Sequence, residues 1–299
     1  MTVQLLVRYG ELALKSAPVR REFEGALRRN LLDQFVHGGM AGRVRSDHGH
    51  LYVEAEEAAP ALRMIARVFG VTSASVVHEV PTDRTLLTAR LLELAEPRLH
   101  PGASFAVRAR RTGQHPFTSQ ELARDLGGDV LDRFPDRHLR VDLEHPEVEL
   151  FVEVRGPRTY LYFDRVEGPG GLPLGVAGRL VALVDGPRGA LGAYLMMKRG
   201  CRVGLVVAPR GETFARDVLA RYDPAVRLTP APAAVEEWPA ALGSLAEELH
   251  ADGVVLPLAV DDYPGVLGRW GDRVIFSPTV GLTEPEVEER WQSVAERAS

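Results

Sequence analysis

The residues best placed to do chemistry lie between positions 181 and 200, where the sequence reads VALVDGPRGALGAYLMMKRG. An apolar strand, a glycine-bearing turn and a helix follow one another, which presents backbone N–H groups and the positive end of a helix dipole to an anion. The side chains of the turn do not suit a phosphate, because Pro187 has no N–H, Asp185 is negative and no hydroxyl is present. An ordinary strand–turn–helix unit of an α/β domain is the alternative interpretation.

Other groups with metal-binding potential are sparse. His48 and His50 form an H-x-H pair without an evident third ligand, so exposed imidazoles in a hairpin are expected instead of a metal site. Asp252, Asp261 and Asp262 are interpreted as ordinary loop carboxylates. The sequence therefore predicts no metal site and assigns no catalytic residue.

Composition indicates a globular cytoplasmic protein of two or three domains. The chain has 299 residues, 45% of them hydrophobic and 26% charged, and no apolar run reaches the ~18 residues of a membrane span. It opens on a strand-like segment without a basic leader, so neither export nor membrane insertion is expected. The single cysteine, Cys201, excludes an intramolecular disulfide, and we expect a packed core thiol instead of a persulfide carrier.

Basic residues concentrate at the front of the chain, although the net charge is −5. The first thirty residues hold three acids and six bases, which are Arg8, Lys15, Arg20, Arg21, Arg28 and Arg29. A second group, Arg108, Arg110 and Arg111, ends a predicted strand, where alternation places Arg108 and Arg110 on one face. Both groups are candidate phosphate contacts. The alternative for the first group is a solvated helix face, and the alternative for the second is a solvated sheet edge or internal ion pairs.

The elements that position these residues begin with a β-α-β-β-α-β order over about 80 residues. A strand at 3–9 precedes a helix that starts near Ser16 and repeats apolar residues at i+4. Strands at 42–46 and 51–55 flank a hairpin turn, and a helix near 60–68 leads to a β-branched run at 71–77. This order is typical of a ferredoxin-like fold.

A second α+β unit and a parallel α/β region follow. Helices are expected near 84–96 and 119–134, the latter capped by Thr118 or Ser119, with strands at 104–110, around 140, at 149–155 and at 159–164. Residues 168–175 (GPGGLPLG) break helix and strand and indicate a junction. Beyond them strands and helices alternate at 179–184, 189–199, 202–207, 211–221, 234–250, 252–256 and 283–297, with a long loop at 223–239.

Four stretches in this order resemble the tRNA 4-thiouridine synthetase family, the THUMP-domain tRNA sulfurtransferases, over about residues 5–207. They are RYGELALK at 8–15, VFGVTS at 68–73, FAVRARR at 105–111 with FTSQE at 117–121, and the junction followed by YLMMKRG at 194–200. The resemblance implies a ferredoxin-like domain at 1–80, a THUMP domain at 81–167, a linker at 168–175 and a PP-loop-like domain, similar to adenine nucleotide alpha hydrolases, at 176–299. It also implies that tRNA is held by Lys15, Arg20, Arg21, Arg28, Arg108, Arg110 and Arg111.

The chain departs from the family at its nucleotide loop. The family's serine-glycine-glycine-any-aspartate-serine motif aligns with residues 184–189, and only Gly186 is retained. The departure removes phosphate donors and a magnesium ligand, since Arg188 stands at the aspartate position and Gly189 at a serine position. The resemblance therefore predicts a degenerate loop made of Asp185, Gly186, Arg188 and Gly189.

Three hypotheses follow. In the first, the protein is a tRNA-binding adaptor without ATP pyrophosphatase activity or cofactor, which holds RNA for a separate tRNA-modifying enzyme. In the second, it is an ATP- and magnesium-dependent tRNA sulfurtransferase with a rebuilt loop, in which Arg188 replaces metal charge. In the third, the C-terminal domain forms a homodimer or docks a partner, since the family commonly pairs its subunits.

Overall fold

The computed structural model describes residues 2–10, 16–47, 50–263 and 273–298. The chain divides into two compact units, one made of Met1–Leu6 with Ser75–Val166 and the other of Val7–Ala74 with Glu167–Ser299. Strands β1 and β4 pass from one unit into the other. No helix in the described part of the chain is both long and apolar enough to cross a membrane.

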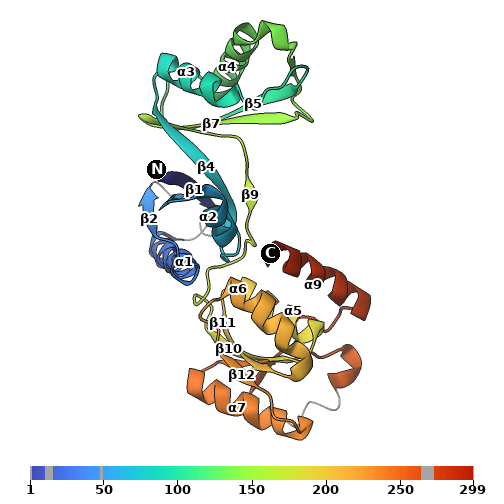
Figure 1. The fold of residues 1–299 in the computed structure, drawn as a ribbon. Coiled ribbons are helices and arrows are strands. Elements are labelled where there is room, and N and C mark those ends of the chain that lie inside the picture. Colours follow the sequence, from blue (N-terminus) through green and yellow to red (C-terminus); the bar gives the residue numbers. More distant parts are fainter. Residues whose placement is uncertain (1, 11–15, 48–49, 264–272, 299) are drawn as a thin grey trace. The chain divides into compact units, whose positions relative to one another are not determined.

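The unit around residues 75–166 is a sheet with two helices on one face (Figure 1). Its strand order is β4-β8-β7-β5-β6, with β5 parallel to β6 and β7. Its core forms where α3 and α4 pack on the sheet, for example through Leu91, Leu126 and Val152. The elements are β4 (Val71–Pro81), α3 (Arg84–Ala95), β5 (Ser104–Thr112), α4 (Ser119–Arg133), β6 (Arg140–Val141), β7 (Val148–Arg155), β8 (Arg158–Tyr162) and β9 (Val166–Glu167).

The predicted start of α4 is confirmed. Thr118 is its N-cap, with its hydroxyl accepting from the Glu121 N–H at 3.1 Å while Glu121 accepts from the Thr118 N–H at 2.7 Å. This reciprocal pair satisfies two N–H groups that the first helical turn leaves unpaired.

The second unit begins with the predicted β-α-β-β-α-β order, which is also confirmed. Pro18 lies in the first turn of α1, and Leu27, Leu31 and Phe35 are buried at the predicted i+4 spacing. Strands β2 and β3 pair antiparallel on either side of the expected hairpin turn. The elements are β1 (Val3–Tyr9), α1 (Ala17–His37), β2 (Gly42–Asp47), β3 (His50–Ala55), α2 (Ala58–Ile65) and β4.

The C-terminal part of this unit is a parallel five-stranded sheet in the order β12-β11-β10-β13-β14. Helices lie on both faces: α5 and α9 form one core with Leu180 and Leu205, and α7 forms another with Val181 and Val206. The elements are β10 (Arg179–Val184), α5 (Pro187–Lys198), β11 (Arg202–Val207), α6 (Ala220–Tyr222), β12 (Leu228–Pro230), α7 (Trp238–Leu249), β13 (Gly253–Val255), β14 (Val274–Phe276) and α9 (Glu284–Ala298).

Sequence periodicity missed two strands of this sheet. The expected loop at 223–239 contains β12, which pairs with β11, and β14 pairs with β13 although no strand was expected there. Each is three residues long and lies at an edge of the sheet, so neither shows a periodic pattern. Pro230 is compatible with its position because an edge strand leaves backbone groups unpaired.

Hydrogen bonds run along the segment expected to be a linker. The N–H of Gly70 donates to the carbonyl of Gly170 at 2.8 Å, and the N–H of Leu172 donates to the carbonyl of Lys198 at 3.0 Å. Gly171 has φ +73°, and a Cβ there would collide with the Lys198 carbonyl. The junction motif is therefore a close-packed connection between the ferredoxin-like domain and the parallel-sheet domain.

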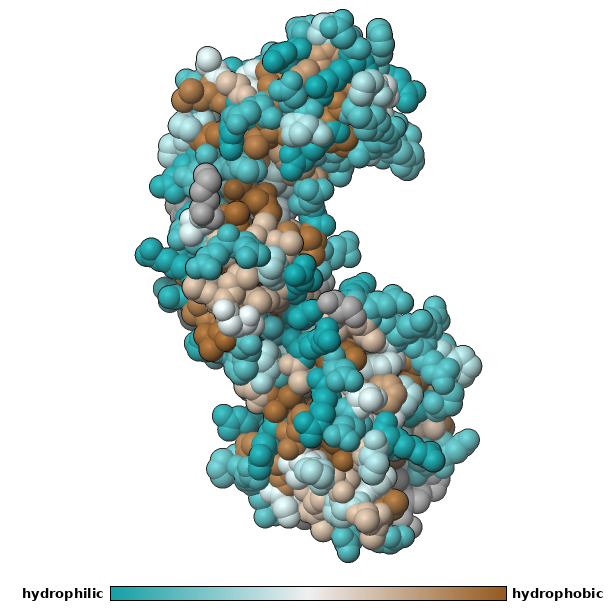
Figure 2. All heavy atoms as spheres, in the orientation of Figure 1, coloured by the Kyte–Doolittle hydropathy of each residue, from teal (hydrophilic) through white to brown (hydrophobic). Residues whose placement is uncertain are grey.

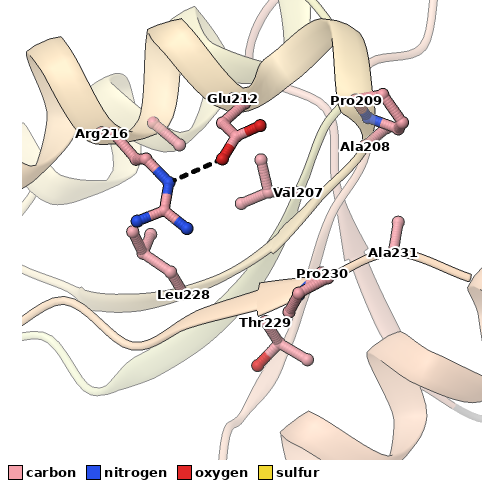
Figure 3. A pocket seen from close by; sticks show the side chains of 10 residues that line it. Val207, Ala208, Pro209, Glu212, Arg216, Leu228, Thr229, Pro230 and Ala231 are labelled. Carbon is pink, nitrogen blue, oxygen red and sulfur yellow. Dashed lines mark hydrogen bonds and ion pairs between the residues drawn. The ribbon is translucent and has the colours of Figure 1, made fainter.

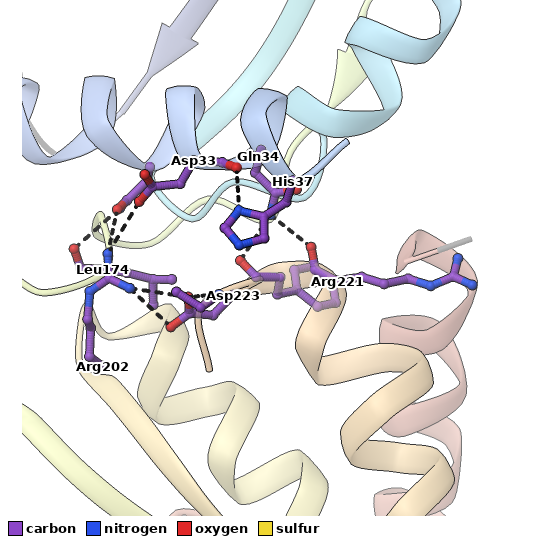
Figure 4. Close-up of polar contacts among 10 residues, drawn as sticks. Asp33, Gln34, His37, Leu174, Arg202, Arg221 and Asp223 are labelled. Atoms are coloured by element: carbon purple, nitrogen blue, oxygen red, sulfur yellow. Dashed lines mark hydrogen bonds and ion pairs between the residues drawn. The ribbon is translucent and has the colours of Figure 1, made fainter. Parts of the chain in front are cut away.

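A polar contact from helix α1 strengthens this connection (Figure 4). Gln34 Nε2 donates to the carbonyl of Arg221 at 2.8 Å. Arg202 donates to Asn30 Oδ1 at 3.3 Å and to the buried Asp223 carboxylate at 3.2 Å. Burial raises the pKa of Asp223, and the charge of Arg202 opposes that rise.

Candidate functional site

A groove of about 480 Å³ lies beside β5, on the first unit. Its lining residues include Arg108, Arg110, Arg165, Glu149, Phe151 and Tyr162, together with the first turn of α4. Strand β6 pairs only with Ser104 and Phe105 of β5, so the part of β5 that carries the arginines is not covered by β6. The predicted shared face of Arg108 and Arg110 is confirmed.

The aromatic part of the groove is a preassembled stack. Phe151 and Tyr162 are register partners on β7 and β8, with ring centroids 4.8 Å apart and planes 6° from parallel. The Arg165 guanidinium lies 4.5 Å from the Phe151 centroid and donates to the Tyr162 hydroxyl at 3.1 Å. Such an arrangement fixes a planar cation in a position favourable for phosphate contact or base stacking.

The predicted arginines of β5 have different environments. Arg108 pairs with Glu149 at 2.8 Å and also donates to the Leu143 carbonyl at 2.8 Å. Arg110 is exposed in the groove, whereas Arg111 donates to the Gly113 carbonyl at 3.2 Å and is not among the groove residues. Arg108 thus has the internal ion pair that was the alternative reading, and Arg110 is the cation best placed for an external anion.

The basic residues of α1 lie on its exposed side. Arg21 and Arg28 are exposed, as is Arg29, while Arg20 is half-buried. Lys15 lies outside the described residues. An RNA role for these side chains stays a prediction.

Arg188, in the first turn of α5, is committed to protein acceptors. The residue is 8% exposed, and its guanidinium binds Glu284 Oε1 through Nε at 3.0 Å and Nη2 at 2.7 Å. It also donates to the carbonyls of Thr279 and Leu282, each at 2.7 Å. The side chain therefore holds the start of α9 and the preceding loop against the N-terminus of α5.

The other residues of the turn differ in how closely the fold surrounds them. Asp185 is half-buried, and burial raises its pKa, with a smaller contribution of the same sign from Glu284. A Cβ at Gly189 would collide with the carbonyl oxygen of Leu183, so glycine permits the close approach of α5 to β10. Gly186 is the N-cap of α5 and is not crowded, with no atom within 4 Å of a hypothetical Cβ.

A cavity of about 180 Å³ lies at the carboxyl ends of β11 and β12 (Figure 3). Glu212 and Arg216 form an ion pair of 2.9 Å along its wall. The hydroxyl of Thr229 is buried there without a hydrogen-bond partner. This end of a parallel sheet is where α/β proteins bind ligands, but the volume is below the ~300 Å³ at which small-molecule sites begin.

The remaining candidate residues lie in structural positions. Cys201 is buried in the core and its thiol donates to the Ala177 carbonyl at 3.2 Å, which confirms the packed thiol. Asp252 accepts from the Arg179 N–H at 3.0 Å, and Asp262 accepts from the Ala259 N–H at 2.8 Å. Within the described ranges no group of three metal-ligating side chains occurs.

Sequence reasoning missed Arg165, Phe151 and Tyr162. Phe151 alternates with the buried residues of β7, and Tyr162 ends a run of buried residues in β8, so both rings resemble ordinary strand residues that pack in the fold. Arg165 lies in the extended segment after β8, and nothing in the sequence indicates which ring it covers. Their meeting depends on the register of β7 against β8.

Comparisons with known proteins agree with this domain arrangement. Residues 4–75 match the ThiI ferredoxin-like domain, and residues 84–164 match the THUMP domain. The chain is 38% identical over 205 residues to a probable tRNA sulfurtransferase of Methanothermobacter thermautotrophicus, over 67% of this chain and 51% of that protein. It is 37% identical over 220 residues to the probable tRNA sulfurtransferase of Methanosarcina acetivorans, over 71% of this chain and 53% of that protein.

Solved structures extend the likeness over the whole fold. PH1313 from Pyrococcus horikoshii has a TM-score of 0.81 at 25% identity, over 97% of this chain and 99% of that one. A 4-thiouridine synthetase in complex with RNA and ATP has a TM-score of 0.80 at 22% identity, over 100% of this chain and 86% of that one, and shows the fold alone. The chain spans about half the length of the curated relatives it matches. Through its ferredoxin-like and THUMP domains and these relatives, the chain belongs to the ThiI-like tRNA sulfurtransferase family.

Proposed function

We propose that the protein binds tRNA and acts in the formation of 4-thiouridine in tRNA. The observation that carries this proposal is the groove on the THUMP domain, where exposed Arg110 and ring-held Arg165 lie beside a stacked aromatic pair. Relatives named tRNA sulfurtransferases support the same reading.

The groove chemistry suits RNA better than a small metabolite. Arginines pair with phosphate oxygens without reading sequence, and aromatic or guanidinium planes stack on unpaired bases. The exposed Arg21 and Arg28 of α1 would add further phosphate contacts. We therefore expect recognition of a folded RNA through its backbone and shape.

The protein has two possible roles in the reaction, as an adaptor without ATP chemistry or as an active ATP-dependent enzyme. The geometry of the α5 loop favours the adaptor. The residues of the α5 loop do not fit a magnesium-bound triphosphate, because Arg188 makes four hydrogen bonds to protein acceptors and Asp185 is a half-buried carboxylate. Pro187 lacks the N–H that a phosphate loop uses. This geometry supports an adaptor that holds tRNA for a separate modifying enzyme.

The comparisons favour the second version, an active ATP-dependent tRNA sulfurtransferase, since the curated relatives carry that name. In this version the phosphates would be held by groups other than Arg188. The dimeric C-terminal domain stays a prediction, and sedimentation at several protein concentrations tests it. The domain boundaries at 80, 167 and 175 also stay predictions.

The binding proposal is tested by titrating purified protein with tRNA. We expect a Kd of about 1 μM or lower that weakens steeply with salt. Arg110→Gln combined with Arg165→Gln should weaken binding about thirtyfold, since two lost charged contacts at ~1 kcal/mol each sum to ~2 kcal/mol. Arg124→Gln, an exposed arginine of α4 paired with Asp125, is the matched control. Equal affinity for tRNA and for an unstructured RNA of the same length would refute the proposal.

The two catalytic versions are separated by ATP binding and by the modification itself. Calorimetry with ATP and magnesium should show no heat of binding if the adaptor version holds. Two results together would establish the enzyme version instead. Deletion of the gene would remove 4-thiouridine from tRNA, and the purified wild-type protein alone would form it on that tRNA when a sulfur donor is supplied.

A further inference from the structure

Three helical segments of the second unit meet around Tyr222, the last residue of α6. Its ring stacks on Phe69, just beyond α2, with centroids 5.3 Å apart. Its hydroxyl donates to the Val294 carbonyl of α9 at 2.8 Å. The side chain is 2% exposed, so the end of α2, α6 and the end of α9 are fixed relative to one another at this point.

Four arginines, which we name the joint arginines, surround this meeting point: Arg63, Arg67, Arg221 and Arg297. Arg67 precedes Phe69 by two residues, and Arg221 directly precedes Tyr222. Arg221 Nη1 donates to the carbonyl of Ala298 at 3.1 Å, which brings it next to Arg297. Figure 4 shows its side chain leaving α6 toward α9, and Figure 2 shows hydrophilic residues around the end of α9.

These cations act on one another. Burial lowers the pKa of Arg67, and the charges of Arg221 and Arg63 lower it further. Both Arg67 and Arg297 favour the ionised form of Tyr222, although burial dominates and raises the pKa of that residue. Like charges gathered in this way are stabilised when an anion binds among them.

The described part of the chain supplies no carboxylate ion pair to Arg63, Arg221 or Arg297. Other arginines of the same unit are paired, as Arg188 is with Glu284 and Arg202 is with Asp223. The C-terminal end of the α9 dipole favours cations, which explains in part why Arg221 and Arg297 lie there. It does not account for Arg63, which lies on α2.

We propose that the joint arginines form a second phosphate-binding surface, which contacts the sugar-phosphate backbone of a structured RNA. A backbone fits better than a single small anion because the cations come from three helical segments, and Arg63, Arg221 and Arg297 are exposed. The hydrogen-bonded junction and the α1 contact hold these elements at fixed spacing, which a track of successive phosphates requires. This inference rests on the proposed tRNA binding and extends it to both domains of the second unit.

The test compares tRNA affinity and its salt dependence in charge-neutral variants of the full chain. Arg63→Gln with Arg221→Gln should weaken tRNA binding about tenfold and lower the slope of log Kobs against log salt by about 1.5. Arg63→Gln alone, which removes no hydrogen bond within the described residues, should give about half of that slope change. Arg227→Gln removes the same charge from an exposed arginine paired with Glu248 and is the control.

The outcomes distinguish this inference from the tRNA-binding proposal. If the wild type binds tRNA and the THUMP groove variant weakens it, but both joint-arginine variants match the Arg227→Gln control in slope, the second surface does not exist. If the wild type fails to prefer tRNA, the proposed function and this inference fall together. Thermal unfolding of each variant shows whether the loss of the Arg221 contact to the Ala298 carbonyl has destabilised the fold, which would lower the affinity without any lost phosphate contact.

Discussion

The role of Arg188 gives the most decisive prediction, because a phosphate ligand and a structural link behave differently on replacement. Arg188→Met keeps most of the aliphatic volume and removes the guanidinium. It leaves the carbonyls of Thr279 and Leu282 without their donor, and it releases Glu284. We therefore expect a lower free energy of unfolding of this unit, with no effect on tRNA binding.

The magnitude follows from the solvent exposure of each partner. Glu284 is 66% exposed and can rehydrate, so the ion pair itself contributes at most ~1 kcal/mol. The two carbonyl acceptors of a charged donor are worth more, and losing both costs about 2–3 kcal/mol. The sum of roughly 3–4 kcal/mol corresponds to a fall in Tm of about 6–16 °C for a domain of this size.

The assay is calorimetric unfolding of the full chain, together with tRNA titration well below the transition. Arg216→Met removes an exposed arginine paired with Glu212 and should lower Tm by less than about 2 °C. A Tm for Arg188→Met within 1 °C of wild type, together with lost ATP binding or lost 4-thiouridine formation, would refute the structural reading and make Arg188 a phosphate ligand.

Further predictions concern the same turn and the core beside it. Gly189→Ala should lower stability by about 2 kcal/mol or more, since its Cβ meets the Leu183 carbonyl. Gly186→Ala should cost less, about 0.5–1 kcal/mol, because its Cβ meets no atom and only the N-cap preference is lost; thermal unfolding of the two variants compares them. Burial raises the folded-state pKa of the Asp185 carboxyl above its unfolded value, so the ionised form destabilises the fold above the folded pKa and this penalty disappears as pH falls. Asp185→Asn should accordingly raise Tm by roughly 1–3 °C at pH 8 and give no gain near pH 4, and an equal gain at both values would contradict the assignment. Burial also raises the pKa of the Cys201 thiol, so iodoacetamide should label it only after unfolding, as followed by mass spectrometry; rapid labelling of the native protein would show an accessible thiolate.

Local sequence signals predicted most elements of the fold. The i+4 spacing that ends at Phe35, the capping residue Thr118 and the alternation from β10 to α9 each reflect short-range backbone physics, and the structure has helices and strands at those places. The short strands β12 and β14 were missed because three residues at a sheet edge form only when a neighbouring strand supplies partners.

The site was predicted less completely, because its contacts join residues far apart in the chain. The sequence by itself identified Arg110 as a candidate phosphate contact, and the family resemblance predicted that Arg188 stands where the family has a metal ligand. Only the tertiary structure decided that Arg165 lies on the Phe151 and Tyr162 rings, and that Arg188 binds a carboxylate 96 residues later. Residue types and short spacings are local properties of the chain, whereas strand register and helix packing determine which distant side chains meet.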